Sequence, residues 1–225
     1  MREVREDKLQ QYITKIVSLY YHQRQKFFIG VGAIVAVIII VPIVFANKGK
    51  ENPEVQLRFT EALGIYSMAS SNPANLDQAE ERFTDFTRRF GGNYLSAKAH
   101  FYLGNINYQR QEYEKARKEF ERAYGKLKGD PVLGPATLFA IGNCFEEQQN
   151  FKKSAQIYEQ VYDKYKKSAI AAEALISSGR CYKQLNDLVN AGRIYNKAVK
   201  DLPPGETAEQ AKAELAYLKA IKDKF

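Results

Sequence analysis

Three glycines at nearly equal intervals constrain the fold of this chain more than any other feature. Gly104, Gly142 and Gly179 are separated by 38 and 37 residues. After each glycine an apolar residue follows at nine positions, a small residue at twelve and an aromatic residue at sixteen. The small residues are Ala116, Ser154 and Ala191, and the aromatic residues are Phe120, Tyr158 and Tyr195. Self-similarity at this interval predicts a repeat fold, in which one unit cannot bury its apolar face alone.

An earlier unit shares the second half of this pattern. Ala79, Phe83 and Phe86 lie 37 residues before Ala116, Phe120 and Ala123. The first half of that unit contains Gly64, but its turn, from Ser70 to Asn75, is three residues longer. The sequence therefore predicts about four units over residues 55–201.

Each unit is predicted to be a pair of antiparallel helices. The chain beyond residue 46 is rich in Tyr, Phe and Ala and has few Val or Ile clusters, which favours helices over strands. We expect each glycine to let two helix backbones approach closely, with the small residue opposite it. The aromatic residue, one turn further on the same face, is expected to fill the space between one hairpin and the next. Helix breakers separate the units at Gly91-Gly92, Gly129-Asp130-Pro131 and Pro203-Pro204-Gly205.

A last helix is predicted over residues 206–225, where it would cap the final hairpin with an apolar stripe formed by Ala211, Leu215, Leu218 and Ile221. The predicted fold is thus all-α, an α-solenoid of helical hairpins.

The repeated residues resemble the tetratricopeptide repeat. The pair Leu103-Gly104, followed by Ala116, Phe120 and Ala123, matches its pattern, and the unit of Gly179, Tyr182, Ala191, Tyr195 and Ala198 matches it best. The chain departs from the family in having no tryptophan, no closing proline in most units, and a longer period. The resemblance covers residues 55–201 and implies a protein-binding module without enzymatic activity.

One run of 20 residues without charge, residues 27–46, predicts a transmembrane helix, because a helix of that length spans about 30 Å. The preceding residues 1–26 hold six basic and three acidic residues. The positive-inside rule therefore predicts a single-pass inner-membrane protein with a cytoplasmic N-terminus and a periplasmic repeat domain, joined by a linker at 47–54. The spacing of apolar residues over 4–20 predicts an amphipathic helix. This helix would either lie on the inner leaflet or dock on a membrane partner.

A cleavable signal peptide is the alternative, because Val44-Phe45-Ala46 resembles a cleavage site. The apolar run is longer than such signals usually have, which favours an uncleaved anchor. A charged N-terminus, one anchor and a periplasmic helical array together resemble the YfgM-like tetratricopeptide proteins of the bacterial envelope. That resemblance implies a role beside the Sec translocon and periplasmic chaperones.

No residues in the chain form a recognisable catalytic motif. The two histidines, His22 and His100, stand alone, so no metal site or other cofactor is predicted. Lys and Glu alternate along the chain, which argues against a nucleic-acid partner despite the net charge of +8. Cys144 and Cys181 occupy the same position of neighbouring units and are expected to be buried and too far apart for a disulfide.

A binding face can be assigned from the resemblance, because the first helix of each hairpin lines the concave face of tetratricopeptide arrays. The residues selected are Phe101, Asn105, Tyr108 and Gln109; Phe139, Asn143, Glu146 and Glu147; and Ile176, Arg180, Lys183 and Gln184. Amides at Asn105 and Asn143 could hold a peptide backbone, and Phe101 stands where recognition of a C-terminal carboxylate needs lysine. Phe101, Phe139 and Ile176 could equally be inter-helix packing residues.

Two hypotheses for the function follow. In the first, the chain is a membrane-tethered module that binds proteins or peptide segments near the export machinery, with the bilayer contacted through residues 27–46 and no small-molecule substrate. In the second, it is a scaffold subunit of another envelope complex, in division, secretion or motility, and self-association through the array matters more.

Overall fold

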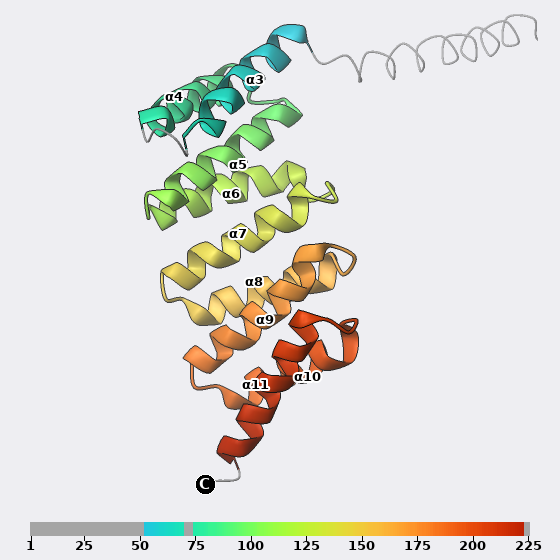
Figure 1. The fold of residues 1–225 in the computed structure, drawn as a ribbon. Coiled ribbons are helices and arrows are strands. Elements are labelled where there is room, and N and C mark those ends of the chain that lie inside the picture. Colours follow the sequence, from blue (N-terminus) through green and yellow to red (C-terminus); the bar gives the residue numbers. More distant parts are fainter. Residues whose placement is uncertain (1–51, 70–73, 223–225) are drawn as a thin grey trace, which may run out of the picture. The chain divides into compact units, whose positions relative to one another are not determined.

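A computed structural model describes residues 52–69 and 74–222, and every regular element in those ranges is an α-helix. The nine helices of these ranges are α3 (Pro53–Ser67), α4 (Ala74–Arg89), α5 (Tyr94–Gln109), α6 (Tyr113–Leu127), α7 (Leu133–Glu147), α8 (Phe151–Lys164), α9 (Ala169–Gln184), α10 (Leu188–Asp201) and α11 (Glu206–Lys222) (Figure 1). The all-α fold predicted from the sequence is confirmed for the described residues.

The helices pack in chain order, each against the next. They form four hairpins, α3–α4, α5–α6, α7–α8 and α9–α10, with α11 packed on the last one (Figure 1). First helices also contact first helices of neighbouring hairpins, because α3 touches α5, α7 touches α9 and α9 touches α11. The predicted solenoid of helical hairpins is thus confirmed.

The predicted membrane span at residues 27–46 lies outside the described residues, as do residues 1–26 and most of the linker at 47–54. Of the helices that the structure describes, none combines the length and the apolar character needed to cross a bilayer. The anchor and the boundaries of the N-terminal segments stay predictions.

The turn inside each of the last three hairpins is closed by a residue with left-handed backbone. After α7, the amide of Gln149 donates to the carbonyl of Glu146 and that of Asn150 to the carbonyl of Phe145, each at 2.8 Å. This pair of bonds is a Schellman motif, whose left-handed position is most often glycine. The same bonds follow α5 and α9, and the left-handed residues of the three turns are Gln111 (φ 63°), Gln149 (φ 57°) and Asn186 (φ 56°).

Polar side chains begin several helices. The Asn150 side chain accepts a hydrogen bond from the amide of Lys153 at 3.3 Å, and Asp187 accepts one from Asn190 at 3.1 Å. Each of these caps directly follows a Schellman motif, so one helix is ended and the next begun within three residues. The chain therefore reverses sharply enough for the two helices of a hairpin to pack along their whole length.

The spacing of glycine and aromatic residue that recurs in three units is explained by a contact within the hairpin. A Cβ at Gly142 would lie 2.6 Å from Cε1 of Tyr158, so the ring occupies the space of the missing side chain. Gly104 with Phe120 and Gly179 with Tyr195 repeat this contact. Each ring also belongs to a core cluster with residues of the following helix, as Phe120 does with Leu138 and Ile141 of α7, so it contributes to the packing between hairpins as expected.

In the unit of Gly142 the small residue lies where it was expected, opposite the glycine. The hydroxyl of Ser154 donates to the carbonyl oxygen of Gly142 at 2.9 Å. Both cysteines are buried and free, as predicted, and Cys181 Sγ lies 3.4 Å from the Ser154 hydroxyl.

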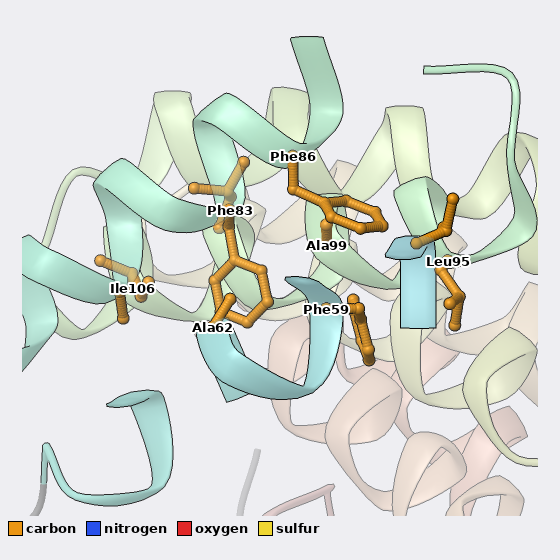
Figure 2. Packing of buried hydrophobic residues seen from close by; sticks show 10 residues of the cluster. Phe59, Ala62, Phe83, Phe86, Leu95, Ala99 and Ile106 are labelled. Atoms are coloured by element: carbon orange, nitrogen blue, oxygen red, sulfur yellow. The ribbon is translucent and has the colours of Figure 1, made fainter. Parts of the chain in front are cut away.

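The first hairpin is packed differently from the others. No atom lies within 4 Å of a Cβ built at Gly64, so this glycine has no aromatic partner. Its core instead joins Phe59 of α3 to Phe83 and Phe86 of α4, with ring centroids 6.0 and 5.6 Å apart (Figure 2). Phe83 also stacks on Tyr102 of α5, with ring centroids 5.2 Å apart, and this contact links the first hairpin to the second.

Candidate functional site

The first helices of the hairpins share a surface, called here the first-helix face, on which polar side chains join one helix to the next. Gln109 of α5 donates to the hydroxyl of Tyr66 on α3 at 3.3 Å. Tyr108, also on α5, donates to Glu147 of α7 at 3.2 Å. These two bonds link the first three hairpins through side chains that reach between equivalent helices.

The same connection continues to the end of the array. Arg180 of α9 donates to both carboxylate oxygens of Glu146 on α7, at 2.9 and 3.1 Å. Lys183 donates to Glu214 of α11 at 2.5 Å, and its ammonium lies 5.1 Å from the centre of the Tyr217 ring. A polar ladder thus runs over α3, α5, α7, α9 and α11. Two of its contacts are ion pairs, Arg180 with Glu146 and Lys183 with Glu214, whereas Glu147 accepts from a phenol.

Tyr108 is held as a neutral hydrogen-bond donor. Its burial, followed by the nearby Glu147 carboxylate, raises the pKa of the phenol above its ordinary value. The ring also meets that of Tyr113 edge-on, with centroids 5.3 Å apart. Because the side chain is half-buried and fixed on both sides, it presents a rigid aromatic surface with a polar tip.

The two asparagines that the sequence placed in matching positions have different surroundings. Within the described residues the Asn105 side chain makes no hydrogen bond and is half-exposed, so its amide is open to a partner. Asn143 is already engaged, because the Tyr158 hydroxyl lies 2.6 Å from its Oδ1 and 2.7 Å from Glu146 Oε2. The two amides are therefore not equivalent: the Asn105 amide is open at both its oxygen and its nitrogen, whereas the oxygen of Asn143 is occupied and only its NH2 group is available to a peptide backbone.

The apolar residues assigned to the face also differ from one another, in their exposure. Ile176 is 2% exposed and belongs to a core cluster with Tyr162 and Leu175, so it is a packing residue and is removed from the site. Phe101 and Phe139 are partly exposed. Their rings lie 5.7 Å from Phe120 and 5.0 Å from Tyr158, so each packs on the aromatic residue of its own hairpin while keeping an exposed edge.

The remaining predicted residues are on the surface. Gln109, Glu147, Arg180 and Gln184 are exposed, and Glu146 and Lys183 are partly exposed. Sequence reasoning missed Tyr66, Glu214 and Tyr217, which extend the ladder at its two ends. Their helices, α3 and α11, depart most from the repeat, so alignment with the other units could not locate them.

The chemistry that this face can perform is binding. Its groups are amides, phenols, aromatic edges and paired charges, which recognise hydrogen-bonding and apolar groups. In the part of the chain that the structure describes, no three His, Cys, Asp or Glu side chains are arranged to hold a metal ion. His100 lies 2.6 Å from Glu119 on the neighbouring helix.

Stacked antiparallel hairpins with a repeated glycine–aromatic contact define the described part of the chain as an α-solenoid. Family models of the tetratricopeptide repeat match residues 74–131 and residues 136–168. Residues 74–131 and 136–168 therefore contain tetratricopeptide repeats, in agreement with the sequence resemblance. The matched ranges cover α4 to α8, and α9–α10 repeat the same contact beyond them.

Solved structures of tetratricopeptide proteins have the same fold. A tetratricopeptide repeat protein from Parabacteroides merdae is 20% identical with a TM-score of 0.58, and the match covers 74% of this chain and 62% of that one. YrrB, described as a TPR protein with an unusual peptide-binding site, is 16% identical with a TM-score of 0.53, over 81% of this chain and 83% of its own.

A putative kinesin light chain from Podosopora anserina with nearly identical TPR-like repeats is 11% identical, with a TM-score of 0.57 and coverages of 78% and 90%. No match was found among curated proteins. The chain spans less than two thirds of the Parabacteroides protein, and all three likenesses concern the fold.

Proposed function

We propose that this chain binds extended or helical segments of other proteins on its first-helix face. The observation that carries the proposal is the open amide of Asn105 beside the rigid ring of Tyr108, on a surface whose two cations, Arg180 and Lys183, are already paired with carboxylates. Such a surface favours backbone hydrogen bonds and aromatic contacts over recognition of a charged terminus. The peptide-binding site named for YrrB, a protein of the same fold, supports this reading.

The proposed setting of that binding is the bacterial envelope. The uncharged run at residues 27–46 anchors the chain in the inner membrane, and the repeats act in the periplasm beside the Sec translocon and its chaperones. This part of the proposal is supported by the run's length, the basic residues before it and the resemblance to YfgM-like proteins. A tether of this kind raises the local concentration of the array beside membrane partners.

Site-specific photo-crosslinking in the native cell tests the proposal. A photoreactive phenylalanine replaces Tyr108 on the first-helix face and, in a matched strain, replaces Gln156, an exposed residue of the second helix α8. We expect Tyr108 adducts with translocon subunits, chaperones or exported chains, and far fewer adducts from position 156. Mass spectrometry identifies the adducts.

The alternative outcomes are distinct. Adducts of this chain with itself, or only with subunits of a division, secretion or motility complex, would replace the export proposal with a scaffold. Equal adduct patterns from positions 108 and 156 would show that the first-helix face has no special role. Asn105→Ala, tested in the same assay, is expected to weaken capture roughly tenfold, since one well-placed interface side chain contributes about 1–2 kcal/mol.

A further inference from the structure

One edge of the array collects the loops that join successive hairpins. The connections after α4, α6, α8 and α10 lie along this edge, together with the start of α3, on the right in Figure 1. The short turns within the last three hairpins lie along the opposite edge (Figure 1). The two edges differ in the charge that they carry.

Five exposed lysines lie at the two middle loops of the first edge and are called here the lysine edge. They are Lys126 in the last turn of α6, Lys128 after that helix, Lys164 at the end of α8, and Lys166 and Lys167 between α8 and α9. The two loops are fastened together, because the Tyr165 hydroxyl donates to the carbonyl of Lys128 at 2.7 Å and lies 3.1 Å from the Tyr124 hydroxyl. The five charges therefore form one patch.

These lysines lack the carboxylate partners that neutralise other cations of the array. Arg180 and Arg193 form ion pairs with Glu146 and Glu159, at 2.9 and 3.0 Å. Within the described residues none of the five lysines forms an ion pair.

Neither of the two acidic residues beside the patch forms an ion pair with one of these lysines. Asp163 pairs with Lys197 at 2.9 Å, and Asp130 accepts hydrogen bonds from the amides of Val132 and Leu133 at 2.8 Å. Lys126 donates to the backbone carbonyl of Gly92 at 2.8 Å, which leaves its charge uncompensated. The patch is thus a net positive surface whose charge is available to a partner.

An apolar tip stands among these charges. Val132 is 71% exposed at the start of α7, next to the exposed Pro131. A hollow of about 440 Å³ lies beside it, lined by Pro131, Lys164, Tyr165 and Lys167 among others. Flexible lysines around an exposed apolar tip are the chemistry of a surface that meets lipid headgroups. Lysine suits this role because its ammonium is a point charge that needs no planar partner.

We propose that the lysine edge docks on the anionic headgroups of the bilayer, with Val132 at the headgroup level. The inference rests on the proposed function, because it takes the membrane from the anchor at residues 27–46. Six residues separate Ala46 from Pro53, and such a linker reaches at most about 21 Å. The start of α3 belongs to the same edge as the lysines, so a short tether before α3 favours the approach of this edge to the lipid surface.

Fluorescence quenching in vesicles that carry the full chain tests the docking. An environment-sensitive dye is attached at Val132→Cys, or at Gln149→Cys in an opposite-edge turn, and headgroup-labelled nitroxide lipid serves as quencher. The native cysteines are both buried, which keeps labelling selective. We expect quenching at position 132 in phosphatidylcholine vesicles containing phosphatidylglycerol, much less without phosphatidylglycerol, and little at position 149 in either.

A charge variant and its control complete the design. In the triple variant Lys164→Gln, Lys166→Gln, Lys167→Gln the quenching is expected to fall to the level in neutral vesicles. Each lysine near an anionic surface contributes roughly fivefold in affinity, so three lysines contribute about 100-fold. Lys152→Gln, Lys153→Gln, Lys219→Gln removes the same charge elsewhere on the exposed surface and is expected to keep the quenching. Circular dichroism verifies that both variants are folded.

Flotation of the vesicles separates the failure of this inference from that of the proposed function. A chain that floats with both vesicle types but shows no quenching at position 132 keeps its anchor and overturns the docking. A chain that floats only with anionic vesicles supports the docking and overturns the anchor. A chain that floats with neither overturns both. Quenching that is equal in neutral and anionic vesicles also overturns the docking. Binding of DNA by the lysine edge without quenching overturns the docking as well.

Discussion

The ring of Tyr158 lies on the α-carbon of Gly142, so that a methyl group on that glycine would be 2.6 Å from Cε1 and 2.8 Å from Cδ1 of the ring. The ring is fully buried, and its hydroxyl reaches Asn143 and Glu146 beyond the glycine. It is therefore fixed at both ends and cannot move aside. This contact holds the two helices of a hairpin at the separation that the repeat requires.

Replacing Gly142 with alanine is expected to destabilise the array. Overpacking a filled core costs about 1–3 kcal/mol, whereas alanine is favoured over glycine in a helix by about 1 kcal/mol. The expected result is a net loss in the free energy of unfolding of up to about 2 kcal/mol, measured by urea denaturation followed by circular dichroism. Gly125→Ala is the matched control, because nothing lies within 4 Å of a Cβ there, and it should stabilise slightly. Equal effects at both positions would contradict the role of the ring.

The sequence predicted this contact only in part. Spacing identified the glycine and the aromatic residue as a linked pair, because the repeat places them sixteen positions apart in three units. It placed the ring between hairpins but did not show that the ring also packs on the glycine of its own hairpin. That contact depends on the side-chain direction and on the turn, and the turn was not recognised because glutamine occupies the position where glycine usually signals it.

The left-handed glutamines lead to a second prediction, in which glycine stabilises the fold. A residue with a side chain at φ 57° is strained, and glycine relieves that strain while losing more entropy on folding. Gln149→Gly is expected to raise the free energy of unfolding by about 0.5–1 kcal/mol. Asn186→Gly should gain less, because asparagine tolerates this conformation. Gln148→Gly, at φ −79°, should instead lose stability, and a gain there would refute the argument.

The hydroxyl of Tyr158 gives a third prediction, because the equivalent Tyr195 lacks its partners. Tyr158 is bonded to Asn143 or Glu146, whereas Tyr195 makes no side-chain hydrogen bond within the described residues. Tyr158→Phe is therefore expected to cost about 1–2 kcal/mol, and Tyr195→Phe to be nearly neutral. Thermal denaturation of the two variants side by side is the measurement. Phenylalanine already occupies this position in the unit of Gly104, so the ring itself is retained without strain.

The candidate face was harder to predict than the core. Its ladder joins residues of different units, such as Tyr108 with Glu147 and Arg180 with Glu146, which lie 39 and 34 positions apart in the sequence. A repeat alignment selects equivalent positions, but bonds between non-equivalent positions depend on how adjacent hairpins are rotated. Asn105 and Asn143 match in sequence yet differ in availability for another reason, because Tyr158 supplies a hydroxyl where the unit of Asn105 has Phe120.

The buried thiols give the last prediction, which concerns alkaline pH. Burial raises the pKa of Cys144 to about 12 and that of Cys181 to about 11. In the unfolded chain these thiols ionise near their ordinary pKa of about 8.5, so the unfolded state releases protons that the folded state keeps. The free energy of unfolding should therefore be independent of the thiols below that pH and fall above it, by about 1.4 kcal/mol per pH unit for each thiol.

Two measurements check the thiols. Urea denaturation between pH 8 and pH 10 should show a steeper loss of stability in the native sequence than in Cys144→Ala, Cys181→Ala, because the variant keeps only the contribution of other groups. Iodoacetamide, which attacks thiolates, should modify neither cysteine in the folded protein and both after denaturation, as read by mass spectrometry. Rapid modification of either cysteine without unfolding would mean that its hairpin opens locally, and would contradict the close packing of Cys181 against Ser154.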